Sequence, residues 1–119
     1  MRVLLLGRDE ELSRYRLGAL EAAGLRVLWP RGKDEAVEMI RAGDFDVALL
    51  SYTLTKETTE QLAELLRQSC PRCPLIVISQ NAWDDPRISP DKIVLASDGP
   101  DALIAAIKSV QRPSIRRVK

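Results

Sequence analysis

The sequence predicts a doubly wound α/β domain with a five-stranded parallel sheet. Two patterns in the 119-residue chain support this prediction. Nearly continuous apolar runs recur along the chain, and segments with helical spacing of apolar residues separate them. Strands that are apolar on both faces are typical of a parallel sheet covered by helices on both sides. Parallel strands joined by such helices require right-handed crossovers.

The predicted strands are short runs rich in leucine, isoleucine and valine. They cover residues 2–7, 25–29, 46–51, 74–79 and 92–96. Five strands alternating with helices fit the flavodoxin-like strand order 2-1-3-4-5.

Four helices are predicted, over residues 10–23, 33–41, 58–69 and 101–111. Asp9 is a natural N-cap for the first helix, and Gly24 and Gly43 follow the first and second, where glycine commonly ends a helix. Pro113 is expected to close the last helix, because proline cannot donate a backbone hydrogen bond. The apolar face predicted for the first helix consists of Leu12, Tyr15, Ala19, Leu20 and Ala23.

The connection between the fourth and fifth strands breaks this pattern. Residues 80–92 contain Pro86 and Pro90, and a proline costs about 3 kcal/mol inside a helix. We therefore expect the fourth crossover helix to be missing or reduced, with Trp83 laid over the sheet. The apolar sheet surface left thinly covered must be covered by the loop, by a partner or by another copy of the chain.

Composition and charge restrict the class of protein. Hydrophobic residues make up 45% of the chain and charged residues 29%, with a net charge of +1, which is typical of a globular domain and gives no bulk signal for nucleic-acid binding. No apolar stretch approaches the roughly 20 residues that span a membrane. We expect a cytoplasmic protein with no membrane partner.

The domain is predicted to cover residues 1–112, followed by a short basic C-terminal tail over residues 113–119. The last eight residues, "RPSIRRVK", carry four basic side chains and no acid. A basic tail can contact nucleic acid, but no aromatic residue is interleaved for stacking. We interpret the tail as a solvated end and do not expect a nucleic-acid partner.

The chain has no histidine and two cysteines, Cys70 and Cys73, in the sequence "CPRC". Two thiolates cannot form a closed zinc site alone, and a redox C-x-x-C motif normally begins a helix. Here the motif lies between a helix and a strand. We interpret it as two thiols in a connecting loop, with an intermolecular zinc site or disulfide as the open alternative.

Four stretches together resemble a response-regulator receiver domain of two-component signalling. They are "LEAAGLRV", "DEAVEMIRAGDFDVALLS", "CPRCPLIVIS" and "DGPDALIAAIKSV". The resemblance runs from Arg2 to about Val110 and is weakest between residues 80 and 92. It implies that phosphoryl transfer would need two acids after the first strand, an aspartate ending the third, a hydroxyl ending the fourth and a lysine ending the fifth.

The resemblance places these five groups on Gly7, Arg8, Ser51, Ser79 and Ala96. Only the hydroxyl of Ser79 matches. Hard divalent cations need carboxylate oxygens, and none is present at the matching positions. The resemblance therefore implies a degenerate pseudo-receiver that lacks the phospho-acceptor aspartate, with no catalytic residue, metal or cofactor.

We expect a phosphorylation-independent protein–protein interaction module in signalling, and no enzyme, because no glycine-rich phosphate loop or catalytic dyad is visible. The alternative is a small-anion or nucleotide-binding domain that uses Arg8, Ser51 and Ser79. In the simplest interpretation, Arg8 instead pairs with a carboxylate such as Asp9 or Asp98.

Candidate interaction residues are Tyr52, Trp83 and Ile88. A homodimer would use the fifth strand, residues 80–92 and the last helix. The sequence identifies neither the signalling partner nor whether a histidine kinase docks on the first helix.

Overall fold

The computed structural model describes residues 1–80 and 89–116, with side chains described up to Val110. Within these residues strands and helices alternate as far as β4, and β5 is the next element described after β4. The elements are β1 (Arg2–Leu6), α1 (Glu10–Ala22), β2 (Arg26–Leu28), α2 (Lys33–Ala42), β3 (Val47–Ser51), α3 (Lys56–Ser69), β4 (Leu75–Ser79), β5 (Lys92–Leu95), a 3-10 turn (Ala96–Asp98) and α4 (Gly99–Arg116).

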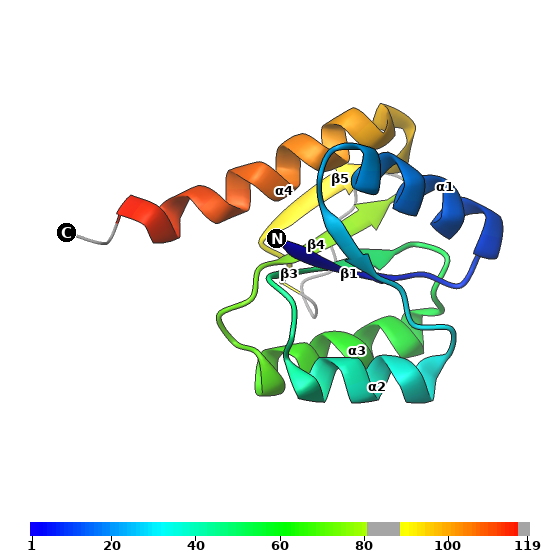
Figure 1. The fold of residues 1–119 in the computed structure, drawn as a ribbon. Coiled ribbons are helices and arrows are strands. Elements are labelled where there is room, and N and C mark those ends of the chain that lie inside the picture. The colour runs from blue at the N-terminus through cyan, green and yellow to red at the C-terminus, as the bar shows by residue number, and fades with distance from the viewer. Residues whose placement is uncertain (81–88, 117–119) are drawn as a thin grey trace.

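The five strands form one parallel sheet in the order β2-β1-β3-β4-β5 (Figure 1). This confirms the predicted flavodoxin-like topology. The register pairs Leu6 of β1 with Leu50 of β3, so the next residues, Gly7 and Ser51, lie beside each other at the carboxyl edge of the sheet. Ser51 in turn pairs with Ile78 of β4.

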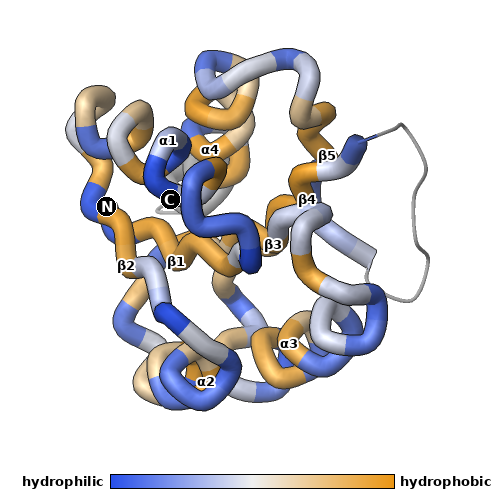
Figure 2. The backbone as a smooth tube through the Cα atoms, turned by 90° about the vertical axis from the view of Figure 1, so that its right-hand side faces the viewer, coloured by the Kyte–Doolittle hydropathy of each residue, from blue (hydrophilic) through white to orange (hydrophobic). Residues whose placement is uncertain are grey.

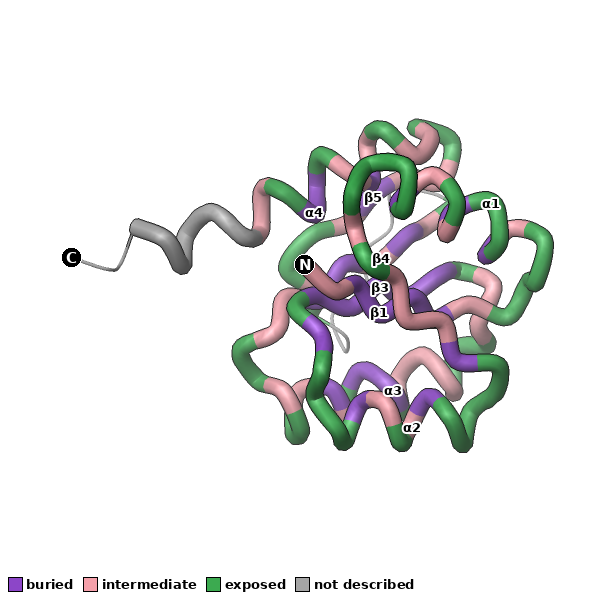
Figure 3. Tube along the Cα trace, in the orientation of Figure 1, coloured by how far each residue is buried: buried purple, intermediate pink, exposed green. Residues whose placement is uncertain are grey.

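Helices cover both faces of the sheet: α1 and α4 on one face and α2 and α3 on the other (Figures 1 and 2). Successive strand residues point to opposite faces, so the central strands β1, β3 and β4 supply both cores and are among the most buried elements (Figure 3). The core under α1 and α4 consists of Val3, Leu5, Leu20, Val47, Leu49, Ile76, Ile78, Val94, Leu103, Ala106 and Ile107. The core over α2 and α3 consists of Leu4, Leu6, Ala36, Ile40, Phe45, Ala48, Leu50, Leu62, Ala63, Leu66 and Leu75.

Helix ends follow the capping residues. The Asp9 side chain accepts a hydrogen bond from the Leu12 backbone N–H at 3.1 Å, which confirms it as the N-cap of α1. Gly43 ends α2 in the left-handed conformation, with φ of 67°. Helix α3 begins at Lys56, two residues earlier than predicted, because the Thr55 hydroxyl accepts the Thr58 N–H at 3.1 Å and forms an N-cap.

The buried face of α1 differs from the predicted one. Tyr15 is 61% exposed and Ala23 is exposed. The residues of α1 that are buried are Ser13, Arg16 and Leu20. Arg16 can lie on the buried face because its guanidinium has a hydrogen-bond acceptor, Ser51 Oγ, beneath the helix.

The prediction that Pro113 closes the last helix is wrong. Helix α4 continues to Arg116, and its C-terminal part extends beyond the sheet (Figure 1). Proline removes one backbone donor, but its fixed φ is compatible with helical backbone. The predicted domain boundary at residue 112 therefore falls within α4.

The connection between β4 and β5 is described only at its ends, and Gln80 and residues 89–91 there are not helical. Both the backbone N–H and the carboxylate of Asp91 bond to the backbone of Leu75, at 2.8 and 2.7 Å. Trp83, Pro86 and Ile88 lie outside the described residues, as do residues 81–88 of the predicted dimer surface. In the part of the chain that is described, no helix has the length and apolar character needed to cross a membrane.

Candidate functional site

Ser51, at the carboxyl end of β3, is the centre of the candidate site. Its side chain is only 2% exposed. The register that places it beside β1 and β4 also brings the loops after β1 and β3 together above it. A hydroxyl buried in this way needs hydrogen-bond partners.

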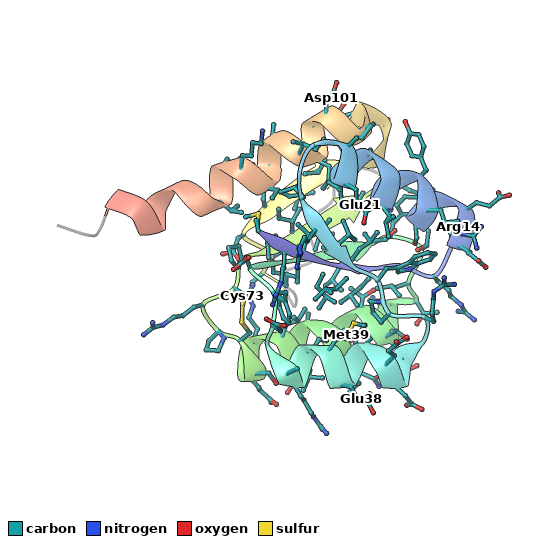
Figure 4. The ribbon with its side chains drawn as sticks, in the orientation of Figure 1. Arg14, Glu21, Glu38, Met39, Cys73 and Asp101 are labelled. Carbon is teal, nitrogen blue, oxygen red and sulfur yellow. A yellow bond between two sulfur atoms is a disulfide. The ribbon has the colours of Figure 1, made fainter. Side chains whose placement is uncertain are left out.

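Arg16 supplies one of these partners. Its Nη1 atom donates a hydrogen bond to Ser51 Oγ at 2.9 Å, and the side chain is only 6% exposed. Arg16 lies one helical turn after Ser13 and one before Leu20, on the buried face of α1. Arg14, by contrast, points away from the sheet (Figure 4) and pairs with Glu10 at 2.7 Å.

Arg16 is a buried cation without a carboxylate partner within the described residues. Burial lowers the pKa of its guanidinium, while Tyr52 and Asp9 act in the opposite direction. The Tyr52 ring centroid lies 5.7 Å from Arg16 Cζ, a distance at which the ring face attracts a cation. Arginine stays protonated in proteins, so the site contains a permanent positive charge.

Thr53 completes the contacts of Ser51. Its hydroxyl and its backbone N–H donate to Ser51 Oγ at 3.1 and 3.3 Å. Thr53 Oγ1 also accepts the backbone N–H of Arg8 at 2.8 Å, which ties the loop after β1 to the loop after β3. We call Arg16, Ser51 and Thr53 the Arg16 network.

Gly7 is tightly packed at its position. A Cβ atom added there would lie 3.0 Å from Ser13 Oγ and 3.2 Å from Ser51 Cβ. Contacts this short require the neighbours to give by a few tenths of an ångström. The close approach of β1, α1 and β3 therefore favours glycine over a larger residue here.

Among the cavities formed by the described residues, those given by the structure do not join Arg8, Ser51 and Ser79. Ser51 is enclosed by the Arg16 network, and Ser79 is half-buried at the end of β4. The exposed side chain of Arg8 lines a separate cavity of about 350 Å³ beside α2 and α3. Within the described residues Arg8 forms no ion pair with Asp9 or Asp98.

Ala96 and Tyr52 line a smaller hollow of about 110 Å³, together with Tyr15, Arg16 and Pro100. The sequence points to Tyr52 and Thr53 on the loop after β3 and to Ala96, but not to Arg16. The signal for Arg16 is the spacing of Ser13, Arg16 and Leu20 along α1. Because two of these three residues are polar, they do not form an apolar pattern.

Cys70 and Cys73 are bonded to each other in a disulfide between α3 and β4 (Figure 4). They are therefore neither the two thiols predicted nor partners in an intermolecular bond. The turn closes because Cys73 N donates to the Cys70 carbonyl at 3.0 Å, which brings the two Cα atoms to 5.5 Å. Over the described residues, no three histidine, cysteine or acidic side chains cluster so as to hold a metal ion.

Comparison with solved structures identifies the fold. An N-terminal domain of a three-domain response regulator/sensory box/GGDEF protein from Carboxydothermus hydrogenoformans is similar over the full length of both chains, with a TM-score of 0.82 at 17% identity. A two-component response regulator from Clostridium difficile has a TM-score of 0.80 at 19% identity, covering 94% of this chain and 96% of its own. The chain has the fold of a receiver domain.

A third receiver, non-phosphorylated HemR from Leptospira biflexa, has a TM-score of 0.77 at 22% identity, with 92% of each chain covered. At these identities the similarity establishes the receiver fold, and a fold alone does not establish a function. No protein-family model matches the sequence. No curated protein matches it either.

Proposed function

We propose that the chain is a signalling module of the response-regulator type that works through protein–protein contacts and without phosphorylation. The receiver fold supports the signalling class. The observation that carries phosphorylation independence is the contact of the buried Arg16 guanidinium with Ser51.

Every group that the structure places on Ser51 Oγ is a donor. These donors are Arg16 Nη1, the Thr53 N–H and the Thr53 hydroxyl. A serine hydroxyl becomes a useful nucleophile when a neighbouring base takes its proton, and these contacts supply none.

The Arg16 network holds the loops after β1 and β3 in one arrangement. A two-state switch needs a ligand or modification with different free energies in the two states. Here the charge at the site is built into the fold, so the domain offers its partner a single surface. This is the behaviour of a constitutive interaction module.

We place the partner contact around the small hollow beside Arg16. Tyr15 and Tyr52 are its large exposed hydrophobic side chains, at 61% and 36% exposure. Aromatic side chains are enriched at protein interfaces, and Tyr52 is positioned by its contact with Arg16. Tyr52 therefore joins the enclosed site to the surface.

The first test is intact mass after incubation with Mg²⁺ and acetyl phosphate. The chain, its Ser51→Ala variant and a phosphorylatable receiver are treated in parallel. We expect an added phosphoryl group on the control receiver only. Addition to the wild-type chain that disappears in Ser51→Ala would refute the proposal.

The second test addresses the protein contact. A photo-crosslinking amino acid is placed at residue 52 in cells, with the same substitution at the exposed Lys108 of α4 as the control. We expect a discrete protein adduct from position 52, with equal yield when Ser51 is replaced by alanine. Equal, diffuse labelling from both positions would argue against a partner surface at Tyr52.

For self-association, we propose an interface formed by β5, residues 80–92 and α4. Replacement of Trp83 by aspartate is predicted to weaken such a dimer. Sedimentation velocity on the two proteins is the measurement, and an unchanged profile would count against this interface.

A further inference from the structure

We infer that the cavity beside α2 and α3 binds a small organic phosphate, a phosphate monoester joined to an apolar or aromatic body. The cavity lies where the loops after β1, β2 and β3 meet, and its volume is about 350 Å³. Small-molecule sites typically measure about 300–1,000 Å³ and lie at the carboxyl ends of the strands in open α/β sheets. This inference does not rest on the proposed signalling function.

Three cationic side chains line this cavity: Arg8 after β1, Arg31 before α2 and Lys33 at the start of α2. No aspartate or glutamate is among its lining residues. We call it the cationic cavity. Three like charges around one hollow repel one another, and a bound anion relieves that repulsion.

Arg31 and Lys33 have side-chain partners within the described residues, and one of these partners is an acid. Arg31 Cζ lies 4.4 Å from the centroid of the Trp29 ring. Its nearest ion-pair partner, Glu10, is 3.8 Å away and is closer to Arg14, at 2.7 Å. Lys33 Nζ donates to the side-chain oxygen of Gln61, which is uncharged.

Backbone and hydroxyl groups add donors to the same wall. Helix α2 begins at the cavity with Gly32 as its N-cap, which provides no side-chain hydrogen bond. A helix N-terminus favours an anion, but Asp34 and Glu35 in the first turn of α2 offset part of its field, and the Glu35 carboxylate accepts the Arg31 backbone N–H at 2.7 Å. Thr55 and Thr58 of the α3 start line the cavity too.

The rest of the lining is apolar, and this determines the class of ligand. Leu6, Ala36 and Leu62 are each at most 3% exposed, and Pro30 and Leu54 lie beside them. Because Leu6, Ala36 and Leu62 already pack within the core, the apolar surface open to a ligand is small and includes the half-buried Leu54. A ligand with an anionic end and an apolar or aromatic body would contact both kinds of surface.

Calorimetric titration of the full chain with adenosine 5′-monophosphate tests the inference, with adenosine and inorganic phosphate as partial ligands. We expect each partial ligand to bind at least about tenfold more weakly than the monophosphate, because charge and apolar contact each contribute. Amide NMR shifts should centre on Gly32 and Lys33.

The variant pair is Arg8→Ala combined with Lys33→Ala, against Arg41→Ala at the far end of α2. We expect the double variant to weaken binding by about tenfold or more, because it removes two charged contacts, and the control to change binding by less than about twofold. All three side chains are exposed, so both proteins should fold.

Four results would overturn the inference. They are no binding to the wild-type chain, an equal loss in Arg41→Ala, binding of inorganic phosphate as tight as that of the monophosphate, and amide shifts centred on Arg16 and Ser51 instead of Gly32. None of these four results bears on the proposed function, because that function is tested separately by phosphorylation and cross-linking.

Discussion

Arg16 and the cations of the cationic cavity lie at the same edge of the sheet and differ in what surrounds them. Arg16 is 6% exposed and donates to Ser51 inside the protein. The cations of the cationic cavity are exposed and line an open hollow. A buried cation with an internal acceptor stabilises one arrangement, whereas exposed cations around a hollow can accept a ligand. The two halves of this edge therefore differ in whether their cations face the interior or an open hollow.

The largest difference is expected in stability. Arg16→Ala removes a buried stem and the hydrogen bond to Ser51, so we expect the free energy of unfolding to fall by about 2–3 kcal/mol. Part of the loss is offset because a desolvated charge disappears. Arg8→Ala should change it by no more than about 0.5 kcal/mol, because Arg8 is exposed. Urea denaturation measures both, and equal losses would remove the contrast.

Gly7 and Gly18 provide the next test. Alanine at Gly7 meets Ser13 and Ser51, and we expect a loss of about 1–3 kcal/mol. Alanine at Gly18, in the middle of α1 with nothing within 4 Å of the added Cβ, should stabilise by about 0.5–1 kcal/mol. Thermal or urea unfolding of the two variants should therefore shift in opposite directions. A stabilising Gly7→Ala would show that the edge is not tightly packed there.

The cationic cavity should contribute little to stability without a ligand. We expect the Arg8→Ala, Lys33→Ala double variant to unfold within about 0.5 kcal/mol of the wild type, because exposed side chains contribute little. Urea denaturation at low and high salt measures this. A large loss would mean that these cations have a structural role, as Arg16 does.

The smallest effect concerns pH. Burial lowers the pKa of Arg16 in the folded state, so the unfolded chain binds more protons only between the two pKa values, where stability would rise with pH. Between about pH 6 and 9 both states are protonated. The difference in the free energy of unfolding between wild type and Arg16→Met, measured by urea denaturation, should therefore stay constant in this range. A difference that changes with pH would indicate coupling of Arg16 to a group that titrates in this range.

Much of the fold followed from local patterns. Apolar runs predicted all five strands, because strands covered on both faces must be apolar throughout. Asp9 and Gly43 predicted helix ends from capping chemistry alone. The end of α4 was not predicted correctly. A proline removes one backbone hydrogen bond, and this loss does not end α4, which continues to Arg116.

The sequence by itself determined the topology of the sheet and the position of Ser51 at the end of β3, because both depend on the order of apolar and polar residues along the chain. Only the tertiary structure decided what Ser51 contacts. Arg16 lies 35 residues away in the chain, and its burial depends on an acceptor supplied by another element. The cationic cavity likewise gathers Arg8 and Lys33 from separate loops. Contacts of this kind arise when distant segments pack together, and no local pattern encodes them.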